Sequence, residues 1–267
     1  MSVRIWHQSA APFGAMGAYQ EALIKHVNAI VSPGTEVVFH GLDPALYAGH
    51  PPADVLKYAY LRQVILSRIV EHCIQAEREG YDAVTIAAYN DPFVREARSI
   101  VDIPVVSMAE CSMLVACGTA KRFALVTLTP ENVWRLREIV ERHGFEKRVS
   151  GIYAIEPRTT ERELSQGFAN PKPVIDLFNR AAERAIAAGA ELVIAAEGVL
   201  NEVLVAHAYQ RVGQTPVLDC VGATFLYAEM MVALRRTTGL AVSRVWDHAK
   251  PDATLVAELR RAAGLNP

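Results

Sequence analysis

An internal repeat limits what this chain of 267 residues can fold into more than any other feature of its sequence. Residues 80–88 resemble residues 189–196, and residues 103–107 resemble residues 215–219. In both halves, an apolar run is followed by a short polar segment and then by a helical pattern. Self-similarity of this kind indicates that one supersecondary unit occurs twice in the chain.

The repeat extends upstream, where two further apolar runs open each half. Residues 3–9 and 35–42 open the first half, and residues 122–129 and 149–155 open the second. Short, continuous apolar runs are typical of parallel strands covered by helices on both faces, and their alternation with helical patterns favours βαβ units. We therefore predict an α/β fold with two pseudo-symmetric lobes, each a roughly four-stranded parallel sheet flanked by helices.

Proline and glycine mark the ends of the predicted helices. The helical patterns cover residues 18–31, 53–80, 130–143, 173–188, 221–238 and 251–264. The long helix after Asp219 follows the last strand of the second half, and we expect it to cross back onto the first lobe. The predicted lobes are then residues 1–107 together with 220–267, and residues 108–219.

The balance of charge excludes several classes of protein. The chain has 27 Lys and Arg against 29 Asp and Glu, so no basic excess suggests a surface for nucleic acid or for a membrane. No apolar run approaches the ~18 residues that a membrane helix needs, and the opening residues lack the pattern of a signal peptide. We expect a cytoplasmic protein that binds neither nucleic acid nor membrane.

The sequence contains no motif for a bound metal or nucleotide. Its four cysteines form no CxxC pair and its eight histidines form no HxxxH or HxH pair, so no common metal pattern is present. Neither GxGxxG nor GxxxxGK[ST] occurs, and no GxSxG motif is found. We therefore predict that the protein uses no cofactor and no metal.

The expected binding site is a cleft between the lobes, because ligands of open parallel sheets bind beyond the carboxyl ends of the strands. The loops after equivalent strands carry hydroxyl, amide and carboxyl groups, which suit a carboxylate or a similar anion. We predict substrate contacts from these loops, made by Gln8, Ser9, Asn90, Thr127, Thr129, Gly198 and Asn201.

Candidate acid/base groups follow matching strands of the two halves. Glu197 follows an apolar strand in the second half, and Tyr89 or Asp91 follows its counterpart in the first. A carboxyl group can act as a base near neutral pH if burial raises its pKa. Two structural alternatives stay open. Glu197 is also a suitable N-cap for the next helix, and Asp91 is a suitable N-cap with Pro92 at the first helical position.

Segments along nearly the whole chain resemble the aspartate/glutamate/hydantoin racemase superfamily, and its hydantoin racemase-like branch in particular. The resemblance rests on residues 86–92, 102–110, 121–127, 195–198 and 228–232. It implies the two-lobed α/β fold and an interlobe active site. It also implies a small carboxylate or cyclic amide as substrate, and a homo-oligomer.

The chain departs from this family at the residues that carry the chemistry. Racemases of the family use two cysteines on opposite faces of the substrate's α-carbon, one to remove a proton and one to return it. Both positions hold alanine here, Ala88 and Ala196, and none of the four cysteines falls on them. Cys220 follows the last strand of the second half, and we expect it to pack in the core rather than to react.

Without the cysteine pair, we predict a cofactor-independent racemase or isomerase in which Glu197, with Tyr89 or Asp91, performs the acid/base chemistry. Such an enzyme would act at the carbon α to a carboxylate or carbonyl group of a small acid or cyclic amide. Two alternatives remain open at this point. One is a lyase, decarboxylase or hydrolase on the same scaffold, and the other is a binding protein without catalysis.

Overall fold

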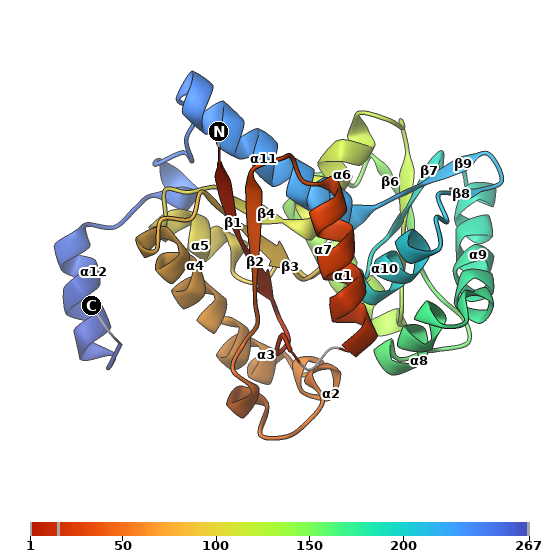
Figure 1. The fold of residues 1–267 in the computed structure, drawn as a ribbon, viewed down its shortest axis with the longest axis horizontal. Helices are drawn as coiled ribbons and strands as arrows, with labels where there is room; N and C mark the ends of the chain where they lie inside the picture. Colours follow the sequence, from red (N-terminus) through yellow and green to blue (C-terminus); the bar gives the residue numbers. More distant parts are fainter. Residues whose placement is uncertain (1, 15–16, 266–267) are drawn as a thin grey trace.

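Two β-sheets lie side by side in the computed structural model, which describes residues 2–14 and 17–265 (Figure 1). The first sheet has the strand order β2-β1-β3-β4 and is parallel throughout. Its strands are β1 (Val3–Ser9), β2 (Thr35–His40), β3 (Ala83–Ala87) and β4 (Val105–Ser107). All four strands come from the first half of the repeat.

The second sheet repeats this arrangement and adds one strand. Its order is β6-β5-β7-β9-β8, with β5 (Phe123–Thr127), β6 (Val149–Ala154), β7 (Leu192–Ala195), β8 (Arg211–Val212) and β9 (Thr215–Leu218). The short β8 pairs with β9 in antiparallel fashion. Gly213 allows this tight turn, because its φ of +58° would strain a residue with a side chain. The predicted α/β fold with two sheets is confirmed, although the second sheet has five strands.

Helices flank both sheets, and none within the described ranges is both long and apolar enough to cross a membrane. The α-helices are α1 (Gly17–Ile30), α2 (Pro52–Leu56), α3 (Ala59–Leu66), α4 (Arg68–Arg78), α5 (Val94–Ile100), α6 (Met108–Cys117), α7 (Pro130–Arg142), α8 (Glu161–Ser165), α9 (Pro171–Ala187), α10 (Gly198–Ala206), α11 (Cys220–Thr238) and α12 (Ala253–Ala262). Three short 3-10 helices are η1 (Pro44–Tyr47), η2 (Gln166–Phe168) and η3 (Trp246–His248).

The single helix predicted over residues 53–80 is wrong, because this segment forms α2, α3 and α4. Tyr58 has extended backbone, with φ −86° and ψ 125°, and separates α2 from α3. At the junction of α3 and α4, the Ser67 hydroxyl donates a hydrogen bond to the Val64 carbonyl, 3.0 Å away. A serine that bonds the backbone of the preceding turn competes with regular helix geometry.

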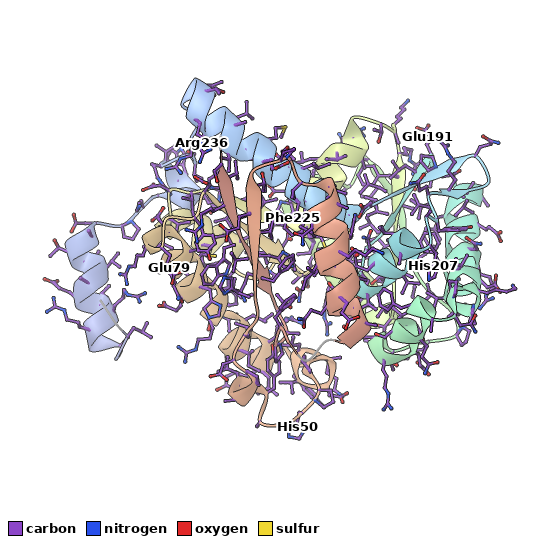
Figure 2. The ribbon with its side chains drawn as sticks, viewed as in Figure 1. His50, Glu79, Glu191, His207, Phe225 and Arg236 are labelled. Carbon is purple, nitrogen blue, oxygen red and sulfur yellow. The ribbon has the colours of Figure 1, made fainter. Side chains whose placement is uncertain are left out.

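Helix α11 begins at the end of the second sheet and extends across the first, where it packs on β1, β3 and β4 (Figure 1). Phe225 lies on this helix over the first sheet, with its ring centroid 5.1 Å from that of His7 on β1 (Figure 2). Helix α6 lies beside α11. One buried apolar cluster therefore includes residues of both sheets as well as α6 and α11.

Gly41 directly follows β2 and allows the loop after β1 to approach closely. A Cβ atom at this position would lie 2.0 Å from the Phe13 nitrogen and 2.6 Å from the Ala11 carbonyl oxygen. Both atoms belong to the backbone of the loop between β1 and α1, so a side chain here would have to displace that loop. The glycine thus helps to position the end of β1 relative to α1.

We predict that Gly41→Ala lowers the free energy of unfolding by roughly 1–3 kcal/mol, the usual cost of overpacking. Urea denaturation measures this change. Gly118→Ala is the matched control, because Gly118 has right-handed helical backbone and the nearest atom to its added Cβ is 3.5 Å away. The control should be neutral or slightly stabilising. A Gly41→Ala protein with an unchanged unfolding midpoint would contradict the prediction.

Candidate active site

Tyr89 and Glu197 occupy matching positions in the two halves. Strand β3 ends at Ala87 and β7 ends at Ala195, and each of the two side chains lies two residues beyond its strand. Both strands are interior to their sheets, because β3 lies between β1 and β4, and β7 lies between β5 and β9. A phenol and a carboxyl group therefore follow equivalent strands at the edge where parallel sheets bind their ligands.

Glu197 is the N-cap residue of α10, which confirms one of the structural alternatives. Its Oε2 accepts a hydrogen bond from the backbone N–H of Leu200, 2.6 Å away. Burial, and then the carboxylate of Glu161, raise the pKa of Glu197 to about 8 in spite of the helix N–H groups that stabilise its charge. A carboxyl group with this pKa can gain or lose a proton near neutral pH.

Gly198 brings a residue of the first half against the start of α10. A Cβ atom at Gly198 would lie 2.8 Å from the hydroxyl oxygen of Tyr19, which comes from α1. Burial, and then the charge of Glu197, raise the pKa of Tyr19 well above its usual range. Sequence reasoning placed Gly198 at the site but missed Tyr19, since no spacing or motif links residue 19 to residue 198.

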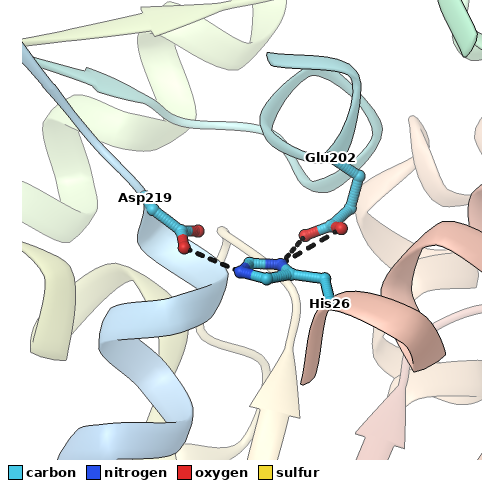
Figure 3. Close-up of side chains that lie close together, drawn as sticks. All are labelled: His26, Glu202 and Asp219. Carbon is cyan, nitrogen blue, oxygen red and sulfur yellow. Dashed lines mark hydrogen bonds and ion pairs between the residues drawn. The ribbon is translucent and has the colours of Figure 1, made fainter. Parts of the chain in front are cut away.

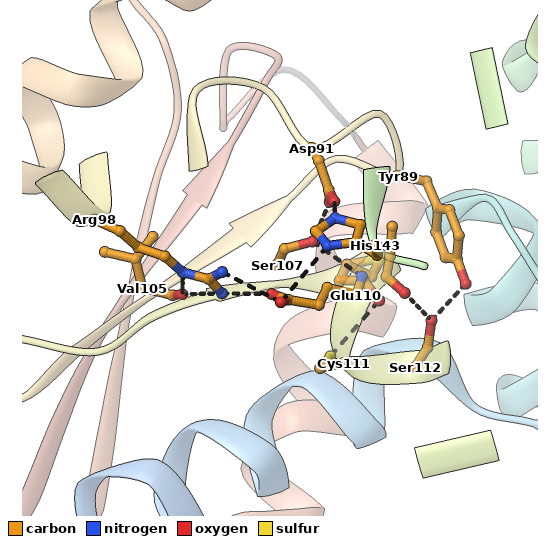
Figure 4. A network of polar contacts seen from close by, with 11 residues as sticks. Tyr89, Asp91, Arg98, Val105, Ser107, Glu110, Cys111, Ser112 and His143 are labelled. Atoms are coloured by element: carbon orange, nitrogen blue, oxygen red, sulfur yellow. Dashed lines mark hydrogen bonds and ion pairs between the residues drawn. The ribbon is translucent and has the colours of Figure 1, made fainter. Parts of the chain in front are cut away.

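The phenol of Tyr89 is held in its protonated form. Its hydroxyl lies 2.5 Å from the Ser112 hydroxyl (Figure 4), which itself donates to the Ala109 carbonyl 3.1 Å away. Burial, and then nearby Cys220, raise the pKa of Tyr89 well above its usual range. Tyr89 is therefore a proton donor rather than a base at neutral pH.

Asp91 joins three elements instead of capping a helix. Its carboxylate accepts hydrogen bonds from the Ser107 hydroxyl and from Nε2 of His143, the second at 2.5 Å (Figure 4). The alternative of Asp91 as an N-cap is wrong, because α5 begins at Val94 with Phe93 as its N-cap. Asp91 and Phe93 have φ of 46° and 57°, so the chain takes left-handed turns before the helix begins.

The polar network of Asp91 continues to an arginine. His143 Nδ1 lies 3.6 Å from Glu110 Oε1, and Glu110 forms an ion pair and hydrogen bonds with Arg98 (Figure 4). Hydrogen bonds from Arg98 outweigh the effect of burial and lower the pKa of Glu110. Asp91 and Glu110 therefore both have hydrogen-bond partners within this network.

A cavity of about 660 Å³ lies beside this network, and its lining includes Asn90, Asp91 and His143. Neither Tyr89 nor Glu197 lines this cavity. The structure thus separates the two first-half acid/base candidates, since Asp91 borders the cavity and Tyr89 points toward α6.

Two of the predicted substrate contacts have internal partners. The amide oxygen of Gln8 accepts hydrogen bonds from Trp6 Nε1 at 2.9 Å and from His72 Nδ1 at 2.7 Å. The amide of Asn201 donates to Asp219 Oδ1 at 2.8 Å. Both side chains are buried, so they organise the ends of β1 and of α10.

The hydroxyl groups predicted to bind substrate lie at the ends of β1 and β5. The Ser9 hydroxyl accepts a hydrogen bond from the Ala11 N–H at 3.1 Å. Thr127 is the buried last residue of β5, and the Thr129 hydroxyl caps α7 by accepting from the Asn132 N–H at 3.3 Å. Their contact with substrate stays a prediction.

Cys220 packs at the end of β7, where its Sγ lies 3.3 Å from the Ala195 carbonyl oxygen. The side chain is fully buried. Burial, and then the carboxylate of Asp219, raise the pKa of this thiol well above its usual range. The thiol therefore stays protonated and is a poor nucleophile or base.

His26 of α1 lies between two carboxylates of the second half (Figure 3). Its Nδ1 is 3.0 Å from Glu202 of α10, and its Nε2 is 3.0 Å from Asp219, the N-cap of α11. Burial lowers the pKa of His26, but hydrogen bonds to Asp219 and Glu202 outweigh it and raise the pKa to about 10. A charged imidazolium thus connects α1 to α10 and α11.

Within residues 2–14 and 17–265, this trio is the group with ligand atoms close enough to hold a metal ion, within 4.8 Å of one another. Each ring nitrogen of His26 faces a different carboxylate. One ion can take only one of these nitrogens, and an imidazolium donates from both. The geometry therefore fits a hydrogen-bonded cation better than a metal centre.

Comparison with known proteins places this chain and its fold in a family. The sequence model of the Asp/Glu/Hydantoin racemase family matches residues 18–228. Hydantoin racemase of Pseudomonas sp. (strain NS671) is 31% identical over 188 residues, which cover 70% of this chain and 72% of that protein. The structure of allantoin racemase from Klebsiella pneumoniae has a TM-score of 0.77 at 25% identity and covers 94% of each chain.

Unliganded arylmalonate decarboxylase has the same fold, with a TM-score of 0.55 at 18% identity over 86% of this chain and 93% of that chain. The chain belongs to the Asp/Glu/hydantoin racemase family, within its hydantoin racemase-like branch, which confirms the resemblance stated from the sequence. It is a racemase-type enzyme and hence an isomerase.

We predict that His26→Gln lowers the free energy of unfolding at pH 7 by about 3–5 kcal/mol, because it leaves buried Glu202 without its cation. The folded pKa of about 10 lies above the unfolded value of 6.5. The stabilisation that protonated His26 gives the folded state is therefore fully present below pH 6.5 and is lost as pH rises from 6.5 to about 10.

Chemical denaturation across this pH range measures the effect. The wild-type protein should lose stability between neutral and alkaline pH, and the variant should lose less. Exposed His50 is the control, so His50→Gln should follow the wild type. A His26→Gln protein with the wild-type pH dependence would contradict the role of this ion pair.

Proposed function

We propose that this protein is a cofactor-independent racemase that uses Glu197 and Tyr89 in place of two cysteines to move a proton at the carbon α to a carbonyl group. The observation that carries the proposal is the matching position of the two side chains, two residues beyond β3 and β7. Their protonation states support it, because Glu197 has a pKa of about 8 while the pKa of Tyr89 is raised well above its usual range.

In the proposed reaction, the Glu197 carboxylate removes the α-proton and the electron pair of the broken C–H bond moves to the carbonyl oxygen as an enolate. The Tyr89 phenol then donates its proton to the opposite face of the carbon, which forms the new C–H bond. The resulting phenolate recovers a proton from Glu197 through solvent. No electrons are gained or lost overall, so the reaction needs no redox cofactor.

We propose a cyclic amide as the substrate class. The relatives that support this class are a hydantoin racemase and an allantoin racemase. A neutral amide carbonyl also suits a carboxylate base, because an enolate formed beside a carboxylate would carry two negative charges. Ser9, Asn90, Thr127, Thr129 and Gly198 are the proposed substrate contacts. Asp91, Gln8 and Asn201 act as positioning residues, since each is buried and hydrogen-bonded to another side chain.

We predict that Glu197→Gln and Tyr89→Phe have different effects on proton exchange at the α-carbon. Glu197→Gln should reduce exchange with heavy water by about 10²–10⁴-fold, because the base is lost. Tyr89→Phe should keep the exchange but lose inversion, because Glu197 can return a deuteron only to the face from which it took the proton. NMR with enantiopure substituted hydantoins measures exchange, and chiral chromatography measures inversion.

Glu183→Gln is the control for this experiment, because Glu183 lies exposed on α9 of the same half. Its exchange and inversion rates should equal those of the wild type. If Glu197→Gln retains turnover of a substrate that the wild type racemises, Glu197 is not the base.

We also predict that Glu161 contributes to the pH dependence of the reaction. As the base must be ionised, kcat/KM should rise with pH through an apparent pKa near 8. Glu161→Gln removes the like charge beside Glu197, so the rise of kcat/KM with pH should occur at lower pH. Unchanged pH–rate profiles in Glu161→Gln would contradict the coupling of these two carboxyl groups.

A further inference from the structure

The cavity beside the Asp91 network has walls from both halves of the chain. Helix α3 of the first half lines one side with Arg62, and α7 of the second half lines the other with Arg135 and Arg142. The loop after β3, helices α5 and α6, and the 3-10 helix η3 also contribute to the lining. At about 660 Å³, the cavity falls within the usual range of small-molecule sites.

Several charges of the cavity wall neutralise one another. Arg95 pairs with Asp247 at 2.6 Å, and Arg98 pairs with Glu110. The Asp91 carboxylate accepts hydrogen bonds from the Ser107 hydroxyl and from His143 Nε2. Arg95 and Arg98 are therefore already engaged by carboxylates.

Arg62 and Arg135 lack a carboxylate partner within ion-pair distance in the described part of the chain. Arg62 donates to the Leu56 carbonyl at 3.4 Å. Arg135 donates to the Lys57 carbonyl at 3.0 Å and to the Asn132 amide oxygen at 3.1 Å. These neutral acceptors hold the two guanidinium groups in place. The carboxylates of Glu131 and Glu138 act on Arg135 without forming an ion pair with it within the described ranges.

The two guanidinium groups also repel each other. Both residues are half-buried. Burial, and then the charge of Arg62, lower the pKa of Arg135. Two like charges held near each other across the boundary between α3 and α7 gain from an anion placed between them.

The other charged residues of the lining that form no ion pair within the described ranges are exposed and carry both signs of charge. Arg142 lies further along the same face of α7, and Glu138 lies between the two arginines in sequence. Glu96 is the other acidic lining residue without an ion pair within the described ranges. The whole lining has five arginines against five carboxylates, so Arg62 and Arg135 would attract an anion through their position beside each other and not through a net positive charge of the cavity.

We infer that the cavity between α3 and α7 binds a small organic oxyanion with at least two negative charges, held by Arg62 and Arg135. The planar guanidinium group donates paired hydrogen bonds to a carboxylate or to a phosphate, so both chemistries fit. The cavity is much larger than an inorganic ion needs, which favours an organic dianion. Neither Glu197 nor Tyr89 lines the cavity, although Asn90, one of the proposed substrate contacts, does.

A bound dianion would connect the two halves of the chain. Arg62 belongs to the half that contains Tyr89, and Arg135 to the half that contains Glu197. A ligand that binds the folded state alone stabilises it by mass action. Occupation of this cavity should therefore raise the thermal unfolding temperature in a concentration-dependent manner.

Calorimetric titration and thermal unfolding at constant ionic strength test the inference. The probes are succinate for a dicarboxylate, glycerol phosphate for a phosphate monoester, and acetate for a monoanion. We expect saturable binding of at least one dianion and much weaker binding of acetate. Arg62→Gln and Arg135→Gln should each weaken it about tenfold or more, the usual effect of losing a charge-assisted hydrogen bond.

Arg137→Gln is the matched control, because Arg137 lies on the same helix α7 but stacks on exposed Trp134 instead of lining the cavity. It should bind the dianion like the wild type, and so should Glu197→Gln. Arg135→Lys keeps the charge and should retain part of the affinity. Circular dichroism establishes that each variant is folded.

Whichever of the two probes binds, succinate or glycerol phosphate, identifies the ligand as a dicarboxylate or a phosphate monoester. The inference is overturned if neither dianion binds saturably, or if Arg62→Gln and Arg135→Gln bind as tightly as Arg137→Gln. Loss of binding in Glu197→Gln with retention in the two arginine variants would place the ligand at the catalytic pair instead. Loss of turnover in Glu197→Gln tests the proposed function and leaves the cavity result unaffected.

Discussion

The arrangement of the site depends on one buried cation between two carboxylates. His26 of α1 bonds to Glu202 of α10 and to Asp219 at the start of α11. Because a buried charge without its partner costs several kcal/mol, these elements of the two halves have to assemble together. The same α1 carries Tyr19, which approaches Gly198 at the start of α10. The ion pair therefore connects the two halves on the helix that Glu197 caps.

Burial acts on both members of the proposed acid/base pair, but their neighbours differ. Burial raises the pKa of Glu197 and of Tyr89 alike. Glu161 adds a like charge beside Glu197, whereas the N–H groups of α10 stabilise its ionised form. These opposing effects bring the pKa of Glu197 close to neutral pH, whereas the phenol of Tyr89 stays protonated. A proton-transfer reaction requires one group that is ionised and accepts a proton, and a second group that is protonated and donates one.

The two groups proposed to react also follow the internal repeat. We predict that the two cysteines of the family correspond to Ala88 and Ala196, and Tyr89 and Glu197 follow these positions by one residue in both halves. Because the offset is one residue in each half, Tyr89 and Glu197 keep the pseudo-symmetric relation of the two family positions. This relation is the reason for proposing that these two residues take over the proton transfer.

The repeat made the fold predictable, because each apolar run corresponds to a strand and each run ends where a sheet binds ligands. A helix cap was one of the two roles that the sequence left open for Glu197, and Glu197 is the N-cap of α10. The break at Tyr58 and the left-handed turns at Asp91 and Phe93 were missed, since helical periodicity says nothing about single dihedral angles. Tyr19 was missed because only tertiary packing brings α1 to α10.

The central claim is that Glu197 changes its protonation near neutral pH, and carbon-13 NMR of protein labelled at glutamate carboxyl groups tests it most directly. We expect one glutamate to titrate near pH 8 and its signal to be absent from Glu197→Gln. If every glutamate titrates near the ordinary value of about 4.3, the carboxyl group of Glu197 is ionised throughout the neutral range. That result would contradict the proposed tuning of this base.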